Sequence, residues 1–203
     1  MGRVSDAKER LMVAVLELIC SGSYGSTTID QICEKAAVKK GSFYYFFSSK
    51  SDLAVVALEA DFQNNKERFD SIFSSTSPPL ERIRKLCRDA MQRQAALKEK
   101  YGRVVGCPLH SLGAEISTLD PRLSAKIQEI IVHFWKYLET AIRDAHAEGA
   151  IYAPDPAGKA RMFFAYYEGL LTQARIQNDV GVLRELEEGV MCLLGIAEQA
   201  GAA

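Results

Sequence analysis

The segment from Thr28 to Leu53 constrains the fold of this chain more than any other stretch. It reads TIDQICEKAAVKKGSFYYFFSSKSDL. Thr28 and Gln31 have the spacing of a capping box and open a short apolar-periodic helix. A turn over residues 37–41 separates that helix from a second short helix over 41–47. Two short helices joined by a tight turn form the unit that places a recognition helix in the major groove of DNA, so the pattern predicts a DNA-binding segment.

The composition is that of an ordinary globular protein. The chain has 203 residues, of which 48% are apolar and 25% charged, which is enough to bury a sizeable core in one or two domains. No uncharged apolar run reaches the ~18 residues that indicate a membrane span. The first residues, MGRVSDAKER, mix both charges before any apolar stretch, unlike a secretory signal. We therefore expect a cytoplasmic protein.

The cysteines argue against a metal centre. They are scattered without a CxxC pair or a Cys/His cluster, so neither structural zinc nor a disulfide framework is expected, and no cofactor is predicted. Such thiols are expected to be mostly small, buried apolar side chains. The five cysteines are Cys20, Cys33, Cys87, Cys107 and Cys192.

The net charge of -1 argues against nonspecific binding to nucleic acid, but the basic residues are unevenly placed. Residues 1–53 hold seven Lys/Arg against six Asp/Glu. Within residues 35–50, however, four lysines occur without any acid. That small basic patch suits a few phosphate contacts per protomer.

The apolar pattern is helical nearly throughout, and no strand stands out, which predicts an all-α protein. Turn signals divide the chain at residues 21–26, at the Ser/Pro-rich stretch 74–79, at Gly102, at Gly149 and at residues 178–181. Helices are expected at about 5–20, 28–36, 41–47, 49–75, 80–98 and 108–117, from Pro121 to Gly149, from Pro156 onward, and after Gly181. We expect an N-terminal three-helix domain over 1–53, a helix from about residue 49 that links the two halves, and a second helical domain over 54–203.

The last two helices carry apolar side chains that recur in steps of three and four. This spacing makes a seam for near-parallel packing at about 20°. A helical hairpin with two such seams can pair with a second copy as a four-helix bundle, or both seams can pack on the chain's own core. The residues assigned to a dimer interface are Phe164, Tyr167, Leu171, Leu186, Val190 and Leu193.

At this point the chain resembles the tetracycline-repressor (TetR) family of bacterial regulators. The match over about 50 residues rests on Thr28, Ile29, Ile32, Ala36-Ala37-Val38, Gly41-Ser42-Phe43-Tyr44, Phe47, Lys50 and Leu53. The resemblance implies a dimer that binds a palindromic operator through the first domain. The second domain would bind a small-molecule inducer and dimerise, with repression as the usual mode.

Four positions depart from the family pattern: Cys33, Ala37, Lys39 and Ser51. Ala37 replaces the usual glycine of the turn, so we expect either backbone strain there or a turn without positive φ.

Two later segments look like one branch of the same family. They are Gly106-Cys107-Pro108-Leu109-His110-Ser111-Leu112 with Glu115, and Glu168-Gly169-Leu170-Leu171 with Ala174-Arg175. These looser matches imply all-helical architecture and C-terminal dimerisation.

The candidate DNA contacts separate into phosphate and base contacts. The helix that Thr28 caps can turn its N-terminus toward a phosphate. By resemblance Tyr44 and Lys50 contact phosphates, whereas Phe43 and Phe47 are core. The side chains expected near base edges lie in the turn and on the exposed side of the second helix. The full set is Thr28, Lys39, Lys40, Ser42, Tyr44, Tyr45 and Lys50.

Aromatic residues crowd the second half, where an apolar site with a few polar groups would bind a small molecule. An aromatic at helical spacing is also a normal core residue, so that reading stays open. The candidate ligand contacts are Cys107, His110, Phe134, Tyr166 and Gln173. Cys107 lies at the expected start of a helix, where the helix dipole favours a thiolate. A buried and inert thiol is the simpler interpretation. Because some members of the family that the chain resembles sense electrophiles or oxidants through cysteine, the resemblance implies as an alternative a repressor that does so through Cys107.

Other classes of function fit less well. The chain has no Ser/His/Asp spacing, no HExxH and no Gly-rich phosphate loop, so an enzyme is not expected. A helical interaction module without DNA binding is the remaining alternative. The basic patch and Tyr44 argue against it.

Overall fold

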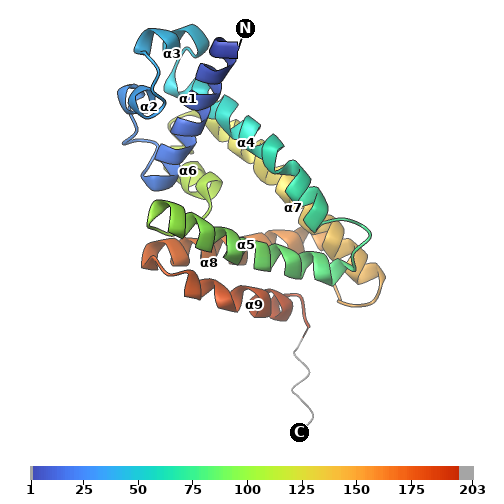
Figure 1. The fold of residues 1–203 in the computed structure, drawn as a ribbon. Coiled ribbons are helices and arrows are strands. Elements are labelled where there is room, and N and C mark those ends of the chain that lie inside the picture. The colour runs from blue at the N-terminus through green and yellow to red at the C-terminus, as the bar shows by residue number, and fades with distance from the viewer. Residues whose placement is uncertain (1, 197–203) are drawn as a thin grey trace. The chain divides into compact units, whose positions relative to one another are not determined.

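The computed structural model describes residues 2–196, with side chains from residue 6 onward, and in that range every regular element is helical. This confirms the all-α prediction (Figure 1). The elements are α1 (Gly2–Ser21), α2 (Ile29–Lys35), α3 (Lys40–Phe46), α4 (Lys50–Ile72), α5 (Pro79–Tyr101), α6 (Pro108–Ile116), α7 (Pro121–Ala147), α8 (Pro156–Gln177), the 3-10 helix η1 (Val180–Glu185) and α9 (Leu186–Leu193).

The chain packs as two compact units whose boundary runs through α4 and α7. One unit comprises the residues up to Asn65 together with Pro108–Ile131. The other comprises Lys66–Cys107 and the residues from Val132 on. Packing thus divides the chain differently from the sequence boundary at residue 53, because α6 and the first half of α7 pack with the N-terminal helices. The functional division at 53 stays a prediction.

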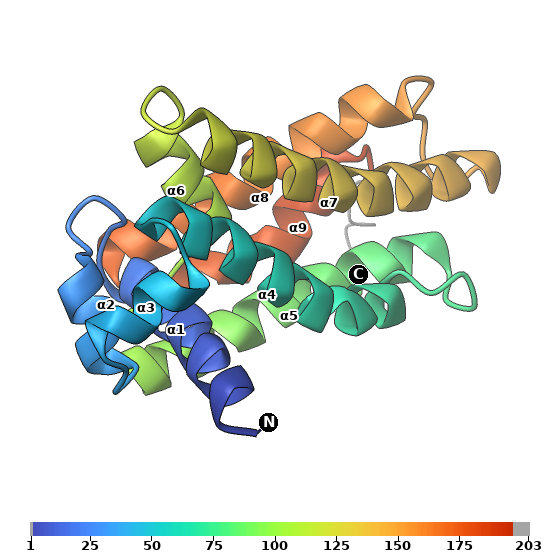
Figure 2. The same cartoon turned by 90° about the horizontal axis from the view of Figure 1, so that it is seen from above.

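The first unit has its core among α1, α2 and α3, which gather together in Figure 2. Phe43 is 0% exposed and Phe47 is 2% exposed, which confirms both as core residues. Leu112 and Ile116 of α6 and Leu123 and Ile127 of α7 belong to the same core. Two ion pairs join α7 to α4 within this unit: Arg122 Nη2 lies 2.9 Å from Asp52 Oδ1, and Lys126 Nζ lies 3.1 Å from Glu59 Oε2.

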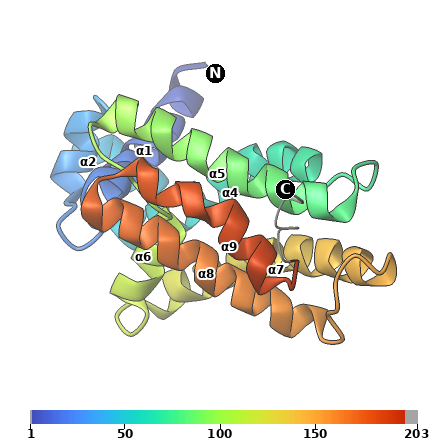
Figure 3. The same cartoon turned by 90° about the horizontal axis from the view of Figure 1, so that it is seen from below.

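The second unit is built on α5, α8 and α9, which lie side by side in Figure 3. Fully buried side chains from each of these helices meet in its core, among them Leu86, Phe163, Leu186 and Val190. Aromatic rings line the neighbouring part of the unit. They are Phe69, Phe73, Phe134, Trp135, Tyr137, Phe163, Phe164 and Tyr167, each within 6.1 Å of another ring of the group by centroid distance.

The C-terminal hairpin differs from the expectation of two continuous helices. The second begins as the 3-10 helix η1, because the Asp179 carboxylate accepts the Gly181 N–H at 2.8 Å and fixes a tight first turn. Leu171, Leu186 and Val190, assigned to a dimer interface, are 0–3% exposed in the chain's own core. The apolar period gave the buried face correctly, but the chain itself covers these three side chains.

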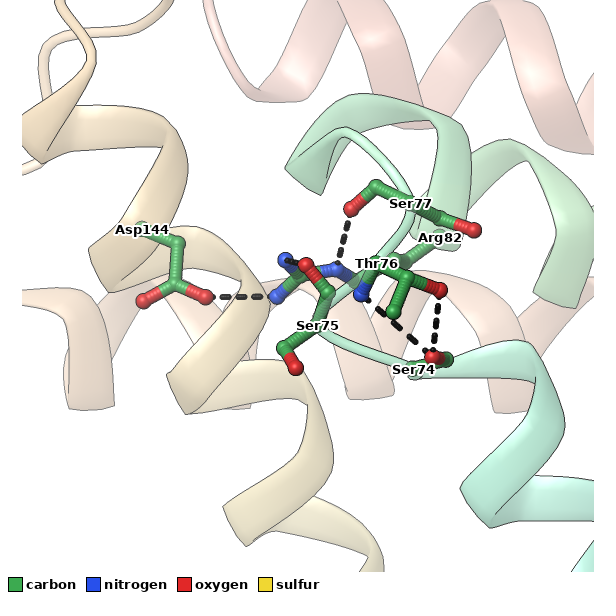
Figure 4. A network of polar contacts seen from close by, with 6 residues as sticks. All are labelled: Ser74, Ser75, Thr76, Ser77, Arg82 and Asp144. Carbon is green, nitrogen blue, oxygen red and sulfur yellow. Dashed lines mark hydrogen bonds and ion pairs between the residues drawn. The ribbon is translucent and has the colours of Figure 1, made fainter.

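A buried arginine fixes the loop between α4 and α5 (Figure 4). Arg82 is 5% exposed, and its Nε and Nη2 donate to the carbonyls of Ser77 and Ser75 at 2.7 and 3.2 Å. Its Nη1 lies 2.5 Å from Asp144 Oδ2 on α7. The guanidinium therefore orders the Ser/Pro-rich linker.

All five cysteines lie in the described part of the chain, and none forms a disulfide. The expectation that most are buried was wrong, because only Cys33 and Cys87 are buried and Cys192 is exposed on α9. Among the described helices, none is both long and apolar enough to cross a bilayer.

Candidate DNA-binding surface and sensing core

The start of α2 has the geometry that its sequence predicts. Thr28 Oγ1 accepts the Gln31 N–H at 3.2 Å, and Gln31 Oε1 accepts the Thr28 N–H at 2.8 Å. Both halves of the capping box are therefore present, which confirms the prediction. The cap satisfies an end of a helix only seven residues long, so α2 needs its neighbours for stability.

The turn between α2 and α3 is strained at Ala37, whose φ is 51°. Its N–H donates to Glu34 O at 3.0 Å, and the Val38 N–H donates to Cys33 O at 2.9 Å. This pair of bonds is a Schellman motif, in which the residue in the left-handed region is usually glycine. The first of the two expected outcomes is thus realised, and alanine costs roughly 1 kcal/mol there relative to glycine. Arg10 Nη1 offsets part of that cost by donating to Ala36 O at 3.0 Å.

Most of the predicted DNA contacts lie on the exposed side of α3. Tyr45 is 78% exposed and Tyr44 is 54% exposed, and Lys39 is exposed at the helix start. Ser42 is half-buried. Lys40 Nζ lies 2.7 Å from Asp30 Oδ1 on α2, and this hydrogen bond raises the pKa of Lys40. Because that pair is open to water, it contributes little to stability and can be exchanged for a phosphate.

Lys50 is held by the chain itself. Its Nζ donates to the carbonyls of Tyr24 and Thr27, at 2.7 Å each, and lies 4.1 Å from the centre of the Tyr24 ring. Burial lowers the pKa of Lys50, partly offset by the charge of Glu115. Two of the three N–H groups of its ammonium are thus used inside the chain.

Three of the candidate ligand contacts, Cys107, Phe134 and Tyr166, pack against the core of the second unit. Phe134 lies in the aromatic part of the second unit, against Phe69, Phe164 and Tyr167. Tyr166 lies instead against η1 and α9: its hydroxyl is next to Gly189 and donates to the carbonyl of Glu185, the last residue of η1, at 3.4 Å. Gln173 is exposed, and His110 is an exposed residue of α6 in the first unit. Cys107 is half-buried in the second unit.

Glu168 is a polar residue of the core that is matched in the family-like segment but is absent from the predicted ligand contacts. It is 3% exposed, and its Oε2 is buried without a hydrogen-bond partner. Burial raises the pKa of Glu168 to about 7, while a hydrogen bond from the Cys107 thiol acts in the opposite direction. One signal was available, because Glu168 falls between Phe164 and Leu171 in the apolar stripe of α8.

Gln94 positions the backbone that leads to Cys107. Its buried amide oxygen accepts the N–H groups of Val105 and Gly106 at 3.2 and 2.9 Å, and its amide nitrogen donates to Gly106 O at 2.9 Å. Gly106 has φ 69°, and a Cβ there would lie 3.2 Å from Leu171 O, so this close approach to α8 requires glycine. Residues 2–196 contain no group of three or more His, Cys, Asp or Glu side chains placed to hold a metal ion.

Comparison with known proteins identifies the class of this fold. A family model described as bacterial regulatory proteins, tetR family, matches residues 11–57, and one described as tetracyclin repressor-like, C-terminal domain, matches residues 79–190. The chain therefore belongs to the TetR family of DNA-binding transcriptional regulators.

Individual relatives agree with this assignment. The transcriptional regulator AcuR of Cereibacter sphaeroides is 30% identical over 173 residues, which cover 84% of this chain and 77% of AcuR. The repressor NemR of Escherichia coli K12 is 21% identical over 175 residues, 85% of this chain and 86% of NemR. The crystal structure of regulatory protein TetR from Rhodobacter sphaeroides matches with a TM-score of 0.81 and 27% identity, over 91% of this chain and 96% of that one. Reduced E. coli NemR matches in fold with a TM-score of 0.82 and 20% identity, over 95% of this chain and 99% of that one.

Proposed function

We propose that the protein is a ligand-responsive repressor of the cytoplasm that binds a palindromic operator as a homodimer and is released by a small-molecule inducer. The observation that carries the proposal is the two-sided α3. Its inner side buries Phe43 completely, and its outer side exposes Tyr44 and Tyr45 next to Lys39. A recognition helix needs this division, because one side packs on its own domain while the other reads DNA.

Within this proposal the DNA contacts have distinct roles. Lys39, Ser42 and Tyr45 face base edges or the adjoining phosphates. Lys40 exchanges its exposed partner Asp30 for DNA, and Lys50 offers its remaining N–H to a phosphate. Thr28 and Tyr44 complete the set and contact phosphates of the DNA backbone.

A homodimer would use the outer side of α8. Met162 and Ile176 are 55% and 77% exposed, and between them the exposed Ala165 and Gly169 continue one stripe. Small residues in such a stripe let two helices approach closely. The hairpin formed by α8, η1 and α9 also contains the half-buried residues Phe164, Tyr167 and Leu193. A twofold dimer matches a palindrome with half-sites about 34–36 Å apart or a multiple of that distance.

Selection of sheared genomic DNA on the purified protein, followed by sequencing, tests the proposal. We expect one enriched palindrome, bound by two protomers in sedimentation.

On that operator Lys39→Gln should weaken binding and flatten the slope of log K against log salt by about one, because one counterion fewer is released. Lys136→Gln, an exposed lysine of α7, is the matched control and should change neither quantity. Unchanged binding by Lys39→Gln would remove Lys39 from the interface.

A second candidate is a repressor that senses electrophiles through Cys107. The observation that favours it is the contact between the Cys107 thiol and the Glu168 carboxyl, which above about pH 7 is ionised and can accept the thiol proton when the sulfur forms a bond to carbon. N-ethylmaleimide should then release the wild-type protein from its operator but not Cys107→Ser. Cys192→Ser, at an exposed cysteine, is the control and should respond like the wild type. Release of Cys107→Ser by the reagent would exclude this mode of sensing.

A further inference from the structure

The loop between α1 and α2 is held by a residue far away in the sequence. Glu115, on α6, accepts the Tyr24 N–H through Oε2 at 3.1 Å and the Gly25 N–H through Oε1 at 2.6 Å. From another side, Lys50 donates to the carbonyls of Tyr24 and Thr27. We call this set of contacts the loop clamp. All its members belong to the first packing unit.

The loop clamp determines where α2 begins. Within the loop, Ser23 bonds with Ser26, and Thr27 donates to the carbonyls of Ser23 and Tyr24. The loop then runs directly into the cap residue Thr28. Since α2 has only seven residues, its position depends on what fixes its ends and on packing. A shift of the loop therefore moves α2 and, through the turn at Ala37, the DNA-facing helix α3.

We propose that Glu115 is a positioning residue for DNA binding: its carboxylate holds the α1–α2 loop so that α2 and α3 are placed to bind the operator. The proposal rests on the DNA-binding function described above. It adds to that function a residue that acts without touching DNA.

The simpler reading is that Glu115 is one of many exposed acids on a protein that binds a polyanion. The two readings predict opposite signs. Removing a merely repulsive charge strengthens DNA binding, because the field at the DNA becomes less negative. Removing a positioning carboxylate weakens DNA binding, because at least one of the two backbone N–H groups loses its acceptor and the loop is no longer held at both: glutamine keeps one acceptor oxygen, and alanine keeps none.

The test measures affinity for the selected operator over a range of salt concentrations. We expect Glu115→Gln to weaken binding about fivefold at every salt concentration. The slope against log salt should stay unchanged, because no phosphate contact is lost. Glu34→Gln, at an exposed acid of α2, is the matched control and should bind equally or slightly more tightly.

A second variant removes the clamp without changing charge. A Cβ on Gly25 would lie 2.8 Å from Glu115 Oε1, so Gly25→Ala should displace the carboxylate and also weaken binding about fivefold. In a Glu115→Ala background Gly25→Ala should add little, because both changes break the same contact. Thermal unfolding of each variant shows whether the domain remains folded.

Three outcomes would overturn the clamp. They are tighter binding by Glu115→Gln, unchanged binding by Gly25→Ala, and additive effects of the two changes. A wild-type protein that retains no DNA in the selection would instead contradict the proposed operator binding. The failure of the clamp and the failure of the function are thereby separated.

Discussion

Replacing Glu168 with Gln should stabilise the protein by about 3 kcal/mol above neutral pH and change its stability little near pH 4. Burial raises the pKa of Glu168 from 4.5 to about 7. The folded state therefore holds the proton over a pH range in which the unfolded state releases it. Below 4.5 both states are protonated, so the carboxyl carries no penalty. As the pH rises to about 7 stability is lost, and above it the full difference of roughly 3 kcal/mol applies.

Glutamine keeps the shape of the side chain and removes the ionisation. Its amide oxygen can still accept a hydrogen bond from the Cys107 thiol. Urea unfolding at several pH values between about 4 and 8 measures the difference. Glu188→Gln, an exposed carboxyl on α9 that is solvated in both states, is the control and should show a small difference at every pH. A gain from Glu168→Gln that is equal at low and high pH would show that the folded state does not hold the carboxyl protonated.

The helix boundaries could be predicted from the sequence, whereas the buried contacts of Glu168 could not. Local signals predicted the helix boundaries well, because a cap or a stop acts within a few residues of itself. Thr28 with Gln31 begins α2, Gly102 ends α5 in the left-handed region at φ 73°, and Asp155 accepts the Gly158 N–H at 2.9 Å to begin α8. Glu168 is a charged residue within the apolar stripe of α8, so its burial could have been predicted from the sequence. However, the helical spacing of apolar residues predicts which face of a helix is buried. It does not predict which side chains from other helices pack against that face.

The remaining differences come from contacts between distant residues. Lys50 was correctly placed at the start of a helix, but its carbonyl partners lie 23 and 26 residues earlier. Glu115 meets its N–H partners across 90 and 91 residues. The seam residue Leu171 was correctly judged to face a packing partner. Whether that partner is a second copy or the chain's own core depends on tertiary packing, which spacing along one helix does not encode.

Replacing Arg82 with Met should destabilise the protein by about 3 kcal/mol, whereas Asp144→Asn should cost only about 1 kcal/mol. The difference follows from burial. The Arg82 side chain is 6% exposed and satisfies two loop carbonyls, so its loss leaves Ser75 O and Ser77 O without their charged donor. The Asp144 side chain is 38% exposed, so water screens its pairing and replaces it in part.

Arg82→Lys separates the charge from the shape of the guanidinium. A lysine keeps the positive charge but lacks the planar fork that reaches both carbonyls, so its cost should fall between the other two. Urea unfolding ranks the three variants, and hydrogen exchange locates the effect. Exchange should quicken at residues 74–77, where Arg82 fixes the link between α4 and α5. If Asp144→Asn lowered the free energy of unfolding as much as Arg82→Met, the ion pair with Asp144 on α7, rather than the contacts with the two carbonyls, would hold the loop.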